Sequence, residues 1–201
     1  MSDNKNLTHN SKKDFLKNPV EHIDITSFDA RKIISSMEKM SFVSRETANA
    51  AGIFNEMIQD KDCTIFLTLA GSTSAAGCMK IYSDMVKYNM IDVIVATGAS
   101  IIDMDFFEAL GFKHYQGSQF QDDTELRKNY IDRIYDTYID EDELQECDKR
   151  ICEIADGLEP RSYTSREFIY AMGKYLKKNS VKKNSLIETA YDNNVPIFCP
   201  A

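Results

Sequence analysis

The sequence has few basic residues and no long apolar segment, and each shortage excludes a class of function. Lysine and arginine number 24 against 32 aspartate and glutamate residues, which gives a formal net charge of -8. Nucleic acid is not expected as the main partner, because binding it requires a basic surface that neutralises phosphates. No apolar run approaches the roughly 18 residues of a transmembrane helix, and residues 1–17 lack the apolar core of a secretory signal. Neither membrane spanning nor secretion is expected.

Cysteine and histidine are also scarce. The five cysteines are odd in number and scattered along the chain: Cys63, Cys78, Cys147, Cys152 and Cys199. This pattern argues against a disulfide framework and favours a reducing cytoplasm. The three histidines have no metal-ligand spacing, and the separation of Cys147 from Cys152 does not match a zinc pair. No metal site is predicted.

The sequence does contain a strand, helix and strand pattern between residues 63 and 100. Residues 63–70 (CTIFLTLA) form an apolar and β-branched run, which predicts a strand buried on both faces. Residues 75–89 have apolar side chains at helical spacing, and Ser72 and Thr73 are placed to cap that helix. Residues 91–96 predict a second strand. This order predicts a right-handed crossover between parallel strands, and therefore an α/β fold.

Each of these strands is followed by a polar glycine turn, the first at residues 71–74 and the second at residues 97–100. Parallel strands end at the same edge of a sheet, and helix amino-termini at that edge attract phosphate. The two turns are therefore candidate phosphate or dinucleotide contacts. The alternative is that Gly71 and Gly98 only make tight turns. Because GSTSAAG is not the G-x-G-x-x-G fingerprint and no P-loop lysine follows, spacing alone leaves both interpretations open.

The flanking segments predict further helices around this core. Residues 1–17 predict a disordered tail, and residues 18–25 predict an extended arm. Two helices should follow and cover one face of the sheet, the second at residues 44–59. Later helices are predicted at residues 101–110, 124–138, 140–156, from 165 and at 185–193, with a loop or short strand at 112–118 and a third buried strand at 195–199. Since the chain stops where a turn should follow that strand, it resembles the front part of a larger α/β domain.

Several polar residues near the turns have two interpretations each. Asp103, Asp105 and Glu108 form an acidic cluster, which usually means a solvated helix face, although Asp103 is placed to face the same cleft as the second turn. His114 is an acid/base candidate or, more simply, a packed loop residue. His22 is interpreted as an arm residue that is hydrogen-bonded locally. Asp103 is therefore the acid retained as a candidate ligand contact.

Six segments, in the same order along the chain, are similar to segments of a known family: PVEHIDI (19–25), LAGS (69–72), MIDVIVATGA (90–99), DFFEALGFKHY (105–115), ELR (125–127) with IDRIY (131–135), and VPIFCPA (195–201). They resemble the deoxyhypusine synthase family, specifically its bacterial and archaeal deoxyhypusine synthase-like branch. The resemblance implies a Rossmann-like parallel sheet flanked by helices. Residues 18–201 would then be a partial NAD-binding domain, incomplete at its carboxyl terminus.

The resemblance also implies a chemistry. Family members bind NAD, assemble as tetramers, and transfer an aminobutyl group from spermidine through an enzyme lysine to a lysine of a translation factor or, in some relatives, to a free polyamine. A cytoplasmic location is expected. Matched position by position, the implied cofactor contacts fall on the following residues: Gly71, Ser72, Thr73, Ser74, Ala75, Thr97, Gly98, Ala99 and Asp103. Asp103 is also the implied contact for the polyamine.

The sequence departs from the family pattern at two positions. Ser72 stands where asparagine is usual, and Ile102 replaces one of two acids, so the choice of spermidine is open. The family's catalytic lysine falls beyond residue 201, and no catalytic residue is nominated. Three functions remain open: an aminobutyl transferase of which this chain is the amino-terminal portion, inactive alone; a non-catalytic split half or regulatory paralogue that completes a full-length subunit; and a free-standing nucleotide-binding module.

Overall fold

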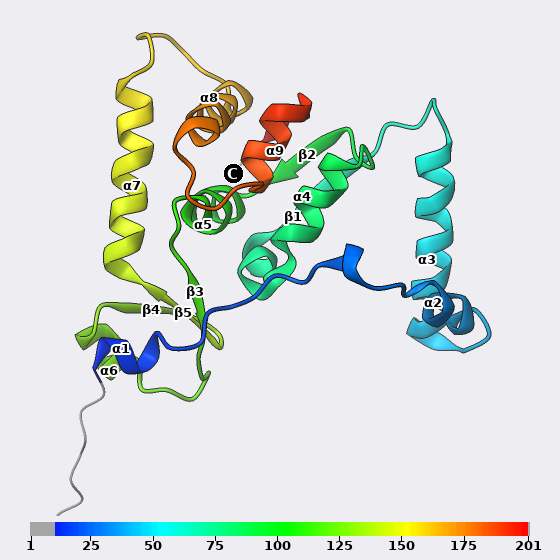
Figure 1. Cartoon of the computed structure of the whole chain (residues 1–201), viewed down its shortest axis with the longest axis horizontal. Coiled ribbons are helices and arrows are strands. Elements are labelled where there is room, and N and C mark those ends of the chain that lie inside the picture. Colours follow the sequence, from blue (N-terminus) through cyan, green and yellow to red (C-terminus); the bar gives the residue numbers. More distant parts are fainter. Residues whose placement is uncertain (1–10, 201) are drawn as a thin grey trace, which may run out of the picture.

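The computed structural model describes residues 11–200, with Ser74 described by its backbone only. It contains two separate three-stranded sheets (Figure 1). The parallel sheet has the order β1-β2-β6, formed by Phe66–Leu69, Val93–Ala96 and Ile197–Phe198. The antiparallel sheet has the order β3-β5-β4, formed by His114–Gln116, Thr137–Asp140 and Ile131–Ile134. Helices flank the parallel sheet, and the predicted α/β class is confirmed.

The parallel sheet forms the crossover that the sequence predicts. From β1 the chain passes through η2 (Gly71–Thr73), η3 (Ser74–Cys78) and α4 (Met79–Lys87) into β2. Phe66 pairs with Val93 and Leu69 pairs with Ala96, so both strands end at the same edge. After β2 the chain enters η4 (Ala99–Phe106) and α5 (Phe107–Ala109). The third predicted strand is confirmed as β6, which pairs parallel to β2, but its predicted burial is wrong for Phe198, which is 38% exposed.

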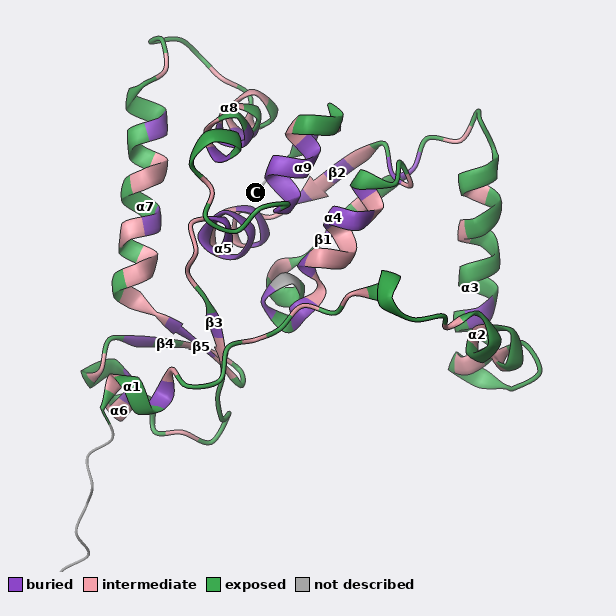
Figure 2. Ribbon diagram, viewed as in Figure 1, coloured by how far each residue is buried: buried purple, intermediate pink, exposed green. Residues whose placement is uncertain are grey.

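The core lies on one face of the parallel sheet. Leu69, Ile94 and Ile197 point into it, and α9 (Leu186–Asn193) packs against both α4 and α8 (Ser165–Asn179). Figure 2 shows the buried residues gathered on α5, α9 and the inner side of α4. A Cβ on Gly173 would lie 2.6 Å from the Cβ of Tyr191, so glycine permits the close approach of α8 to α9.

The opposite face of this sheet is only partly covered. Phe66 is 60% exposed and Phe198 is 38% exposed, and Thr68 between them along the sheet is also exposed. The prediction that residues 63–70 are buried on both faces is therefore wrong for β1. The physical reason is that β1 is an edge strand and that the two helices expected to cover this region pack elsewhere.

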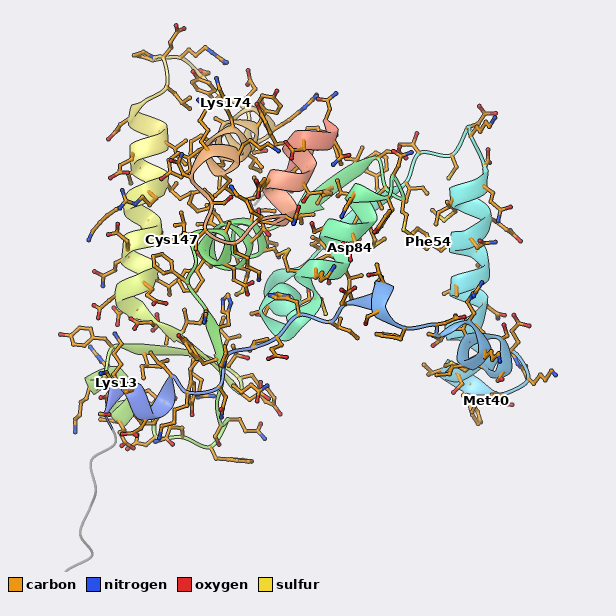
Figure 3. The ribbon with its side chains drawn as sticks, in the orientation of Figure 1. Lys13, Met40, Phe54, Asp84, Cys147 and Lys174 are labelled. Carbon is orange, nitrogen blue, oxygen red and sulfur yellow. The ribbon has the colours of Figure 1, made fainter. Side chains whose placement is uncertain are left out.

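Those two helices are α2 (Arg31–Met37) and α3 (Phe42–Gln59). They pack against each other at one end of the molecule, where most of their surface is exposed (Figures 1 and 2). Ala48 is the buried residue of α3, and Phe54, on the side of α3 that faces the rest of the chain in Figure 3, reaches the core only partly. The expected coverage of the sheet by these helices is wrong, because α3 leaves side chains such as Val43 and Ile53 in solvent.

The single helix predicted at residues 124–138 is also wrong. The chain forms α6 (Asp123–Lys128) and then the hairpin of β4 and β5. Tyr130 has φ +54° and Tyr135 has φ +57°, and these left-handed residues end the helix and turn the hairpin. Apolar residues at positions 126, 131 and 134 have the spacing of a helix. The chain forms strands here because β5 pairs with β3, a strand that precedes this segment and that local spacing does not reveal.

The amino-terminal tail is shorter than predicted. Residues 1–10 lie outside the described part of the chain, but Lys12–Phe15 form the helix α1. Phe15 is buried with its ring edge-on to Tyr138 at 6.0 Å, and Lys12 forms an ion pair with Asp140 at 2.6 Å. These contacts fix α1 against β5, so the tail predicted for residues 1–17 does not extend through this helix.

The carboxyl-terminal helices follow their sequence signals closely. Asp140 caps α7 (Glu141–Asp156), Thr164 caps α8 through a capping box with Glu167, and Ser185 caps α9. The 112–118 segment contains the short strand β3, and a single turn, η1 (Ile25–Ser27), follows the arm. Within residues 11–200, no helix is long and apolar enough to cross a membrane.

Candidate functional site

The structure brings the two glycine turns together. The hydroxyl of Ser100 donates a hydrogen bond to the carbonyl oxygen of Gly71 over 2.8 Å, which links the start of η4 to η2. The same hydroxyl lies 3.3 Å from the Thr97 hydroxyl. The turns therefore form one continuous surface at the carboxyl edge of β1 and β2, which is the position at which open α/β sheets bind their ligands.

The predicted cofactor residues differ in how far they reach solvent. Ser72 and Thr73 are exposed, Gly71 is half-buried, and Ala75 is buried. The side chain of Ser74 lies outside the described residues. In the second turn Thr97, Gly98 and Ala99 are all half-buried. Ala75 is therefore covered in this structure, whereas the exposed residues Ser72 and Thr73 are open to a ligand.

The first turn is irregular. It passes from the 3-10 turn η2 into the π-helix η3, with φ +37° at Gly71 and φ +89° at Gly77. The prediction that Ser72 or Thr73 caps the following helix is wrong, because neither side chain accepts a hydrogen bond from α4, and the Thr73 hydroxyl instead contacts the Ala70 carbonyl at 3.4 Å. Non-α turns of this kind are frequent at functional sites.

Gly98 begins the second turn in an ordinary helical conformation, with φ -54°. A Cβ at this position would meet nothing within 4 Å. Neither the backbone nor packing within the described chain therefore requires glycine here. A residue without a side chain at the amino-terminal end of η4 lets a ligand approach the backbone closely, and this geometry fits the phosphates of a dinucleotide.

A buried polar network lies beside the first turn. The Glu108 carboxylate contacts His22 Nε2 at 2.6 Å through Oε2 and His114 Nδ1 at 2.9 Å through Oε1, and it also pairs with Lys182. The side chains of His22 and Glu108 are each 8% exposed. Burial raises the pKa of Glu108, but its hydrogen bonds to the two histidines and Lys182 outweigh burial and hold the pKa well below the usual range.

Sequence reasoning missed this network. The local hydrogen bonding expected for His22 is wrong, since its partners are Glu108 and Met79, and the solvated face expected for Glu108 and Asp105 is wrong, since both are buried. His114 is packed as expected. Its Nε2 has no hydrogen-bond partner among the described residues. His114 lies six positions after Glu108, but His22 lies 86 positions before it, so no local sequence signal could have identified the network.

Asp105 has a structural role, because its carboxylate binds the backbone at the start of α9. Its two oxygens accept hydrogen bonds from the backbone N–H groups of Leu186 and Ile187, both at 2.7 Å, at the amino-terminus of α9. Burial raises the pKa of Asp105 to about 6, although these backbone hydrogen bonds oppose the shift. A buried carboxylate thus joins the second turn's helix to α9.

Asp103 is half-buried, and its pKa is raised, first by burial and then by the nearby charge of Asp148 on α7, while His114 opposes the shift. Beside it, Cys147 donates to the Ile102 carbonyl at 3.8 Å, and burial raises the pKa of this thiol to about 12. Figure 3 shows Cys147 on the side of α7 that faces η4 and α5. Asp103 thus lies beside α7, and its contact with a ligand stays a prediction.

The described residues contain no group of three or more histidine, cysteine, aspartate or glutamate side chains arranged to hold a metal. One cavity is lined by several charged groups, which include Lys80, Asp84, Glu108 and Lys182. These charges already pair with one another or with neighbouring residues. The chemistry of this region is therefore best sought at the two turns.

Comparison with known proteins identifies the family of this chain. A family model described as "DS: Deoxyhypusine synthase" matches residues 32–201. A deoxyhypusine synthase-like protein of Coxiella burnetii (strain RSA 493 / Nine Mile phase I) is 64% identical over 200 residues, which cover 98% of this chain and 57% of the relative. The corresponding protein of Caulobacter vibrioides is 65% identical over 196 residues, covering 97% of this chain and 53% of the relative.

A more distant relative, named probable deoxyhypusine synthase 2, comes from Methanosarcina acetivorans and is 37% identical over 187 residues, or 93% of this chain and 54% of its own. A solved structure from Entamoeba histolytica has a similar fold, with a TM-score of 0.56 and 21% identity, covering 90% of this chain and 62% of that one. The chain thus spans little more than half the length of the curated relatives it matches. Over that span, and with the family model matching most of its residues, the chain belongs to the deoxyhypusine synthase family.

Proposed function

We propose that this chain provides the NAD-binding part of an enzyme that transfers an aminobutyl group from spermidine, or a related polyamine, to an acceptor amine. The hydrogen bond from Ser100 to the Gly71 carbonyl is the observation that best supports this role, because it joins the two turns into one surface at the sheet edge. Family membership supports the same cofactor and reaction class.

In this proposal the two turns bind the dinucleotide through their backbone. Gly98 and Ala99 offer N–H groups at the start of η4, where the helix end is electropositive and Gly98 leaves room for close approach. Ser72 and Thr73 offer exposed hydroxyls from the first turn. Bound NAD would supply the acceptor for the hydride that leaves the polyamine. The chain itself would bind and orient the cofactor.

Asp103 is the proposed contact for a cationic amine. Burial and Asp148 raise its pKa, and a bound ammonium group would oppose both effects by stabilising the ionised carboxylate. Because Ile102 occupies the neighbouring position, the chain offers one acid there in place of two. The identity of the preferred polyamine is therefore part of the proposal that experiment must decide.

The imine-forming lysine is proposed to belong to the part of the family protein that this chain does not span. No lysine of residues 11–200 is nominated in its place. The acceptor, either a protein lysine or a free polyamine, and the assembly into tetramers are likewise proposals from the family.

A second candidate is a non-catalytic half that completes or regulates a longer subunit. The partly covered face of the parallel sheet favours it, with Phe66 and Phe198 left in solvent. Parallel sheets are normally covered on both faces, so this surface is suited to bind further polypeptide. In both candidates the chain works together with the segment that the longer relatives contain.

The test is an activity assay of the purified chain with NAD and radiolabelled spermidine. The assay is run with and without an acceptor, and with and without the carboxyl-terminal segment of the Coxiella relative. The chain alone should form no NADH and transfer no label, and both activities should appear when the segment is added. NADH formation or label transfer by the chain alone would contradict the proposal. If the segment binds to the chain but the mixture forms no NADH and transfers no label, the non-catalytic candidate is favoured.

A further inference from the structure

The first turn is held in place by residues outside it. Its path from Gly71 to Cys78 changes from a 3-10 turn to a π-helix and is broken at Gly77, which has φ +89°. At its beginning, Ser100 donates to the Gly71 carbonyl. At its end, the N–H of Ile23 donates to the Gly77 carbonyl at 3.1 Å, and the N–H of Met79 donates to His22 Nδ1 at 3.1 Å. The amino-terminal arm therefore fixes one end of the turn.

These contacts fix the proton on His22. Nδ1 accepts a hydrogen bond from the Met79 N–H, so it bears no proton. Nε2 must then bear it and donate to Glu108 Oε2 at 2.6 Å. His22 is thus a neutral imidazole in one tautomer, and it links a buried carboxylate to the first backbone amide of α4. It replaces the helix cap that neither Ser72 nor Thr73 provides.

Apolar burial does not explain how this arm is held. Ile23 is 47% exposed and Ile25 is 38% exposed, whereas the His22 side chain between the arm and α4 is 8% exposed. The arm also fits closely against Gly77, because a Cβ there would lie 2.8 Å from the Glu21 carbonyl oxygen. The arm is held by backbone pairing with β3, where the Val20 N–H donates to the His114 carbonyl at 2.8 Å, and by His22, whose side chain is the part of the arm that binds α4 and Glu108.

We propose that His22 is a positioning residue for cofactor binding: through its bond to the Met79 amide, and held by Glu108, it sets the conformation of the first turn. The proposal rests on the proposed function, since it assumes that residues 71–75 contact the dinucleotide. It adds the arm, far away in sequence, to the residues that determine cofactor affinity. His22 does not contact the cofactor itself.

Two variants of His22 separate its two hydrogen bonds. In His22→Asn, the side-chain oxygen occupies the place of Nδ1 and can still accept from Met79, but the contact with Glu108 is lost. In His22→Gln, the amide reaches towards Glu108 and no acceptor remains for Met79. Ile23→Ala, on the same arm with an exposed side chain, is the control. NAD affinity is measured by calorimetric titration, and protection of the Met79 amide is measured by hydrogen exchange.

His22→Gln should weaken NAD binding by about tenfold or more and should expose the Met79 amide to exchange. His22→Asn should stay within about threefold of the parent, as should Ile23→Ala. Equal NAD affinities of the His22→Gln variant, the His22→Asn variant and the parent would overturn the proposal. If the parent bound no NAD, the proposed function would fail, and Met79 exchange would still decide whether His22 orders the turn.

A measurement on the unaltered chain guards against a variant that fails to fold. Nitrogen NMR of the His22 ring should show Nε2 protonated and Nδ1 unprotonated near neutral pH, and the Nδ1 signal should shift when NAD is added. A ring protonated at Nδ1 would contradict the bond to Met79 and overturn the proposal, as would an Nδ1 signal that saturating NAD leaves unchanged.

Discussion

The two glycine turns lie side by side and are built in opposite ways. The second turn runs directly into the core, where Ser100, Ile101, Met104 and Phe106 are buried and Asp105 and Glu108 find their partners. The first turn exposes Ser72 and Thr73, has positive φ angles at Gly71 and Gly77, and receives hydrogen bonds from Ser100 and from the arm. The second turn is thus ordered mainly by burial, whereas the exposed part of the first turn is ordered by contacts with its neighbours.

This difference indicates which part of the candidate site has a rigid backbone and which part has a backbone that can change conformation. Backbone amides of a buried helix start are positioned before any ligand arrives, which keeps the ordering cost of binding low. The surface turn lacks that support and gains it through a few hydrogen bonds. Changes in the second turn's helix should therefore alter stability as well as binding, whereas changes near the first turn should mainly alter binding.

The largest expected effect is a loss of stability on removal of the Glu108 carboxylate, which belongs to the second turn's helix and contacts the arm that holds the first turn. Glu108→Ala deletes charged hydrogen bonds to His22, His114 and Lys182, and it should lower the free energy of unfolding by about 3 kcal/mol or more. Urea unfolding measures the change. Glu153→Ala, which removes an exposed pair with Arg150, should cost under about 1 kcal/mol. Equal losses in the two variants would contradict the anchoring role of Glu108.

The next effect concerns Asp103, beside the second turn. Asp103→Asn should weaken the use of amine or NAD by at least about tenfold, because a charge-assisted hydrogen bond is worth about 1.5 to 3 kcal/mol once the bound ligand desolvates this half-buried carboxylate. Kinetics are measured on the chain completed with the Coxiella segment. Asp156→Asn, at the exposed end of α7, is the matched control. If the kinetics of Asp103→Asn match those of the control, Asp103 does not contact the amine or the cofactor.

Gly98→Val probes close approach at the second turn. The side chain would extend into open space at the start of η4, and NAD affinity should fall by about tenfold or more. Gly52→Val on α3 places the same side chain into open space far from both turns and should leave NAD affinity unchanged. Unaltered NAD binding by Gly98→Val would remove this glycine from the site.

The smallest effect is a pH dependence that tests how Asp105 holds the second turn's helix. The pKa of Asp105 is raised to about 6 in the folded chain, so the folded state retains its proton more strongly than the unfolded state. This contribution to stability is present at low pH and is lost as the pH rises from about 4 to about 6, by at most about 1.4 kcal/mol per pH unit. Glu108 has a lowered pKa and acts oppositely, with its contribution lost as the pH falls below about 4.5.

Urea unfolding of the parent and of Asp105→Asn, between pH 5 and pH 6, isolates this contribution. The parent should lose stability relative to the variant as the pH rises through this interval, because only the parent ionises a buried carboxylate there. Parallel stability curves for the two proteins would show that Asp105 does not titrate in this range.

The sequence was sufficient for elements that local signals define. Ser185, Asp140 and the run at residues 91–96 each predict an element that the structure confirms. Helix caps and a crossover between parallel strands are both recognised from residues close together in the sequence. The parallel crossover also predicts that the two turns lie at the same edge of the sheet. That part of the candidate site follows from spacing, the parallel crossover and chain order.

Distant partners decide the rest. Residues 131–134 fit a helix by spacing and become β4, because β5 pairs with both β4 and β3. His22, the cap of α4, lies 57 positions before Met79, so no local pattern identifies it. Burial of Glu108 likewise requires the arm, β3 and the α8 to α9 connection to meet around it. Contacts across such separations are set by the tertiary fold.

Amide NMR during an NAD titration tests most directly whether the two turns together form a dinucleotide site. The Gly71 and Gly98 amide signals of the labelled chain should shift with a common saturation curve, while Gly52 on α3 stays fixed. A common curve would show that one ligand meets both turns. Signals of Gly71 and Gly98 that remain fixed at millimolar NAD, or that move no more than the Gly52 signal, would contradict the account.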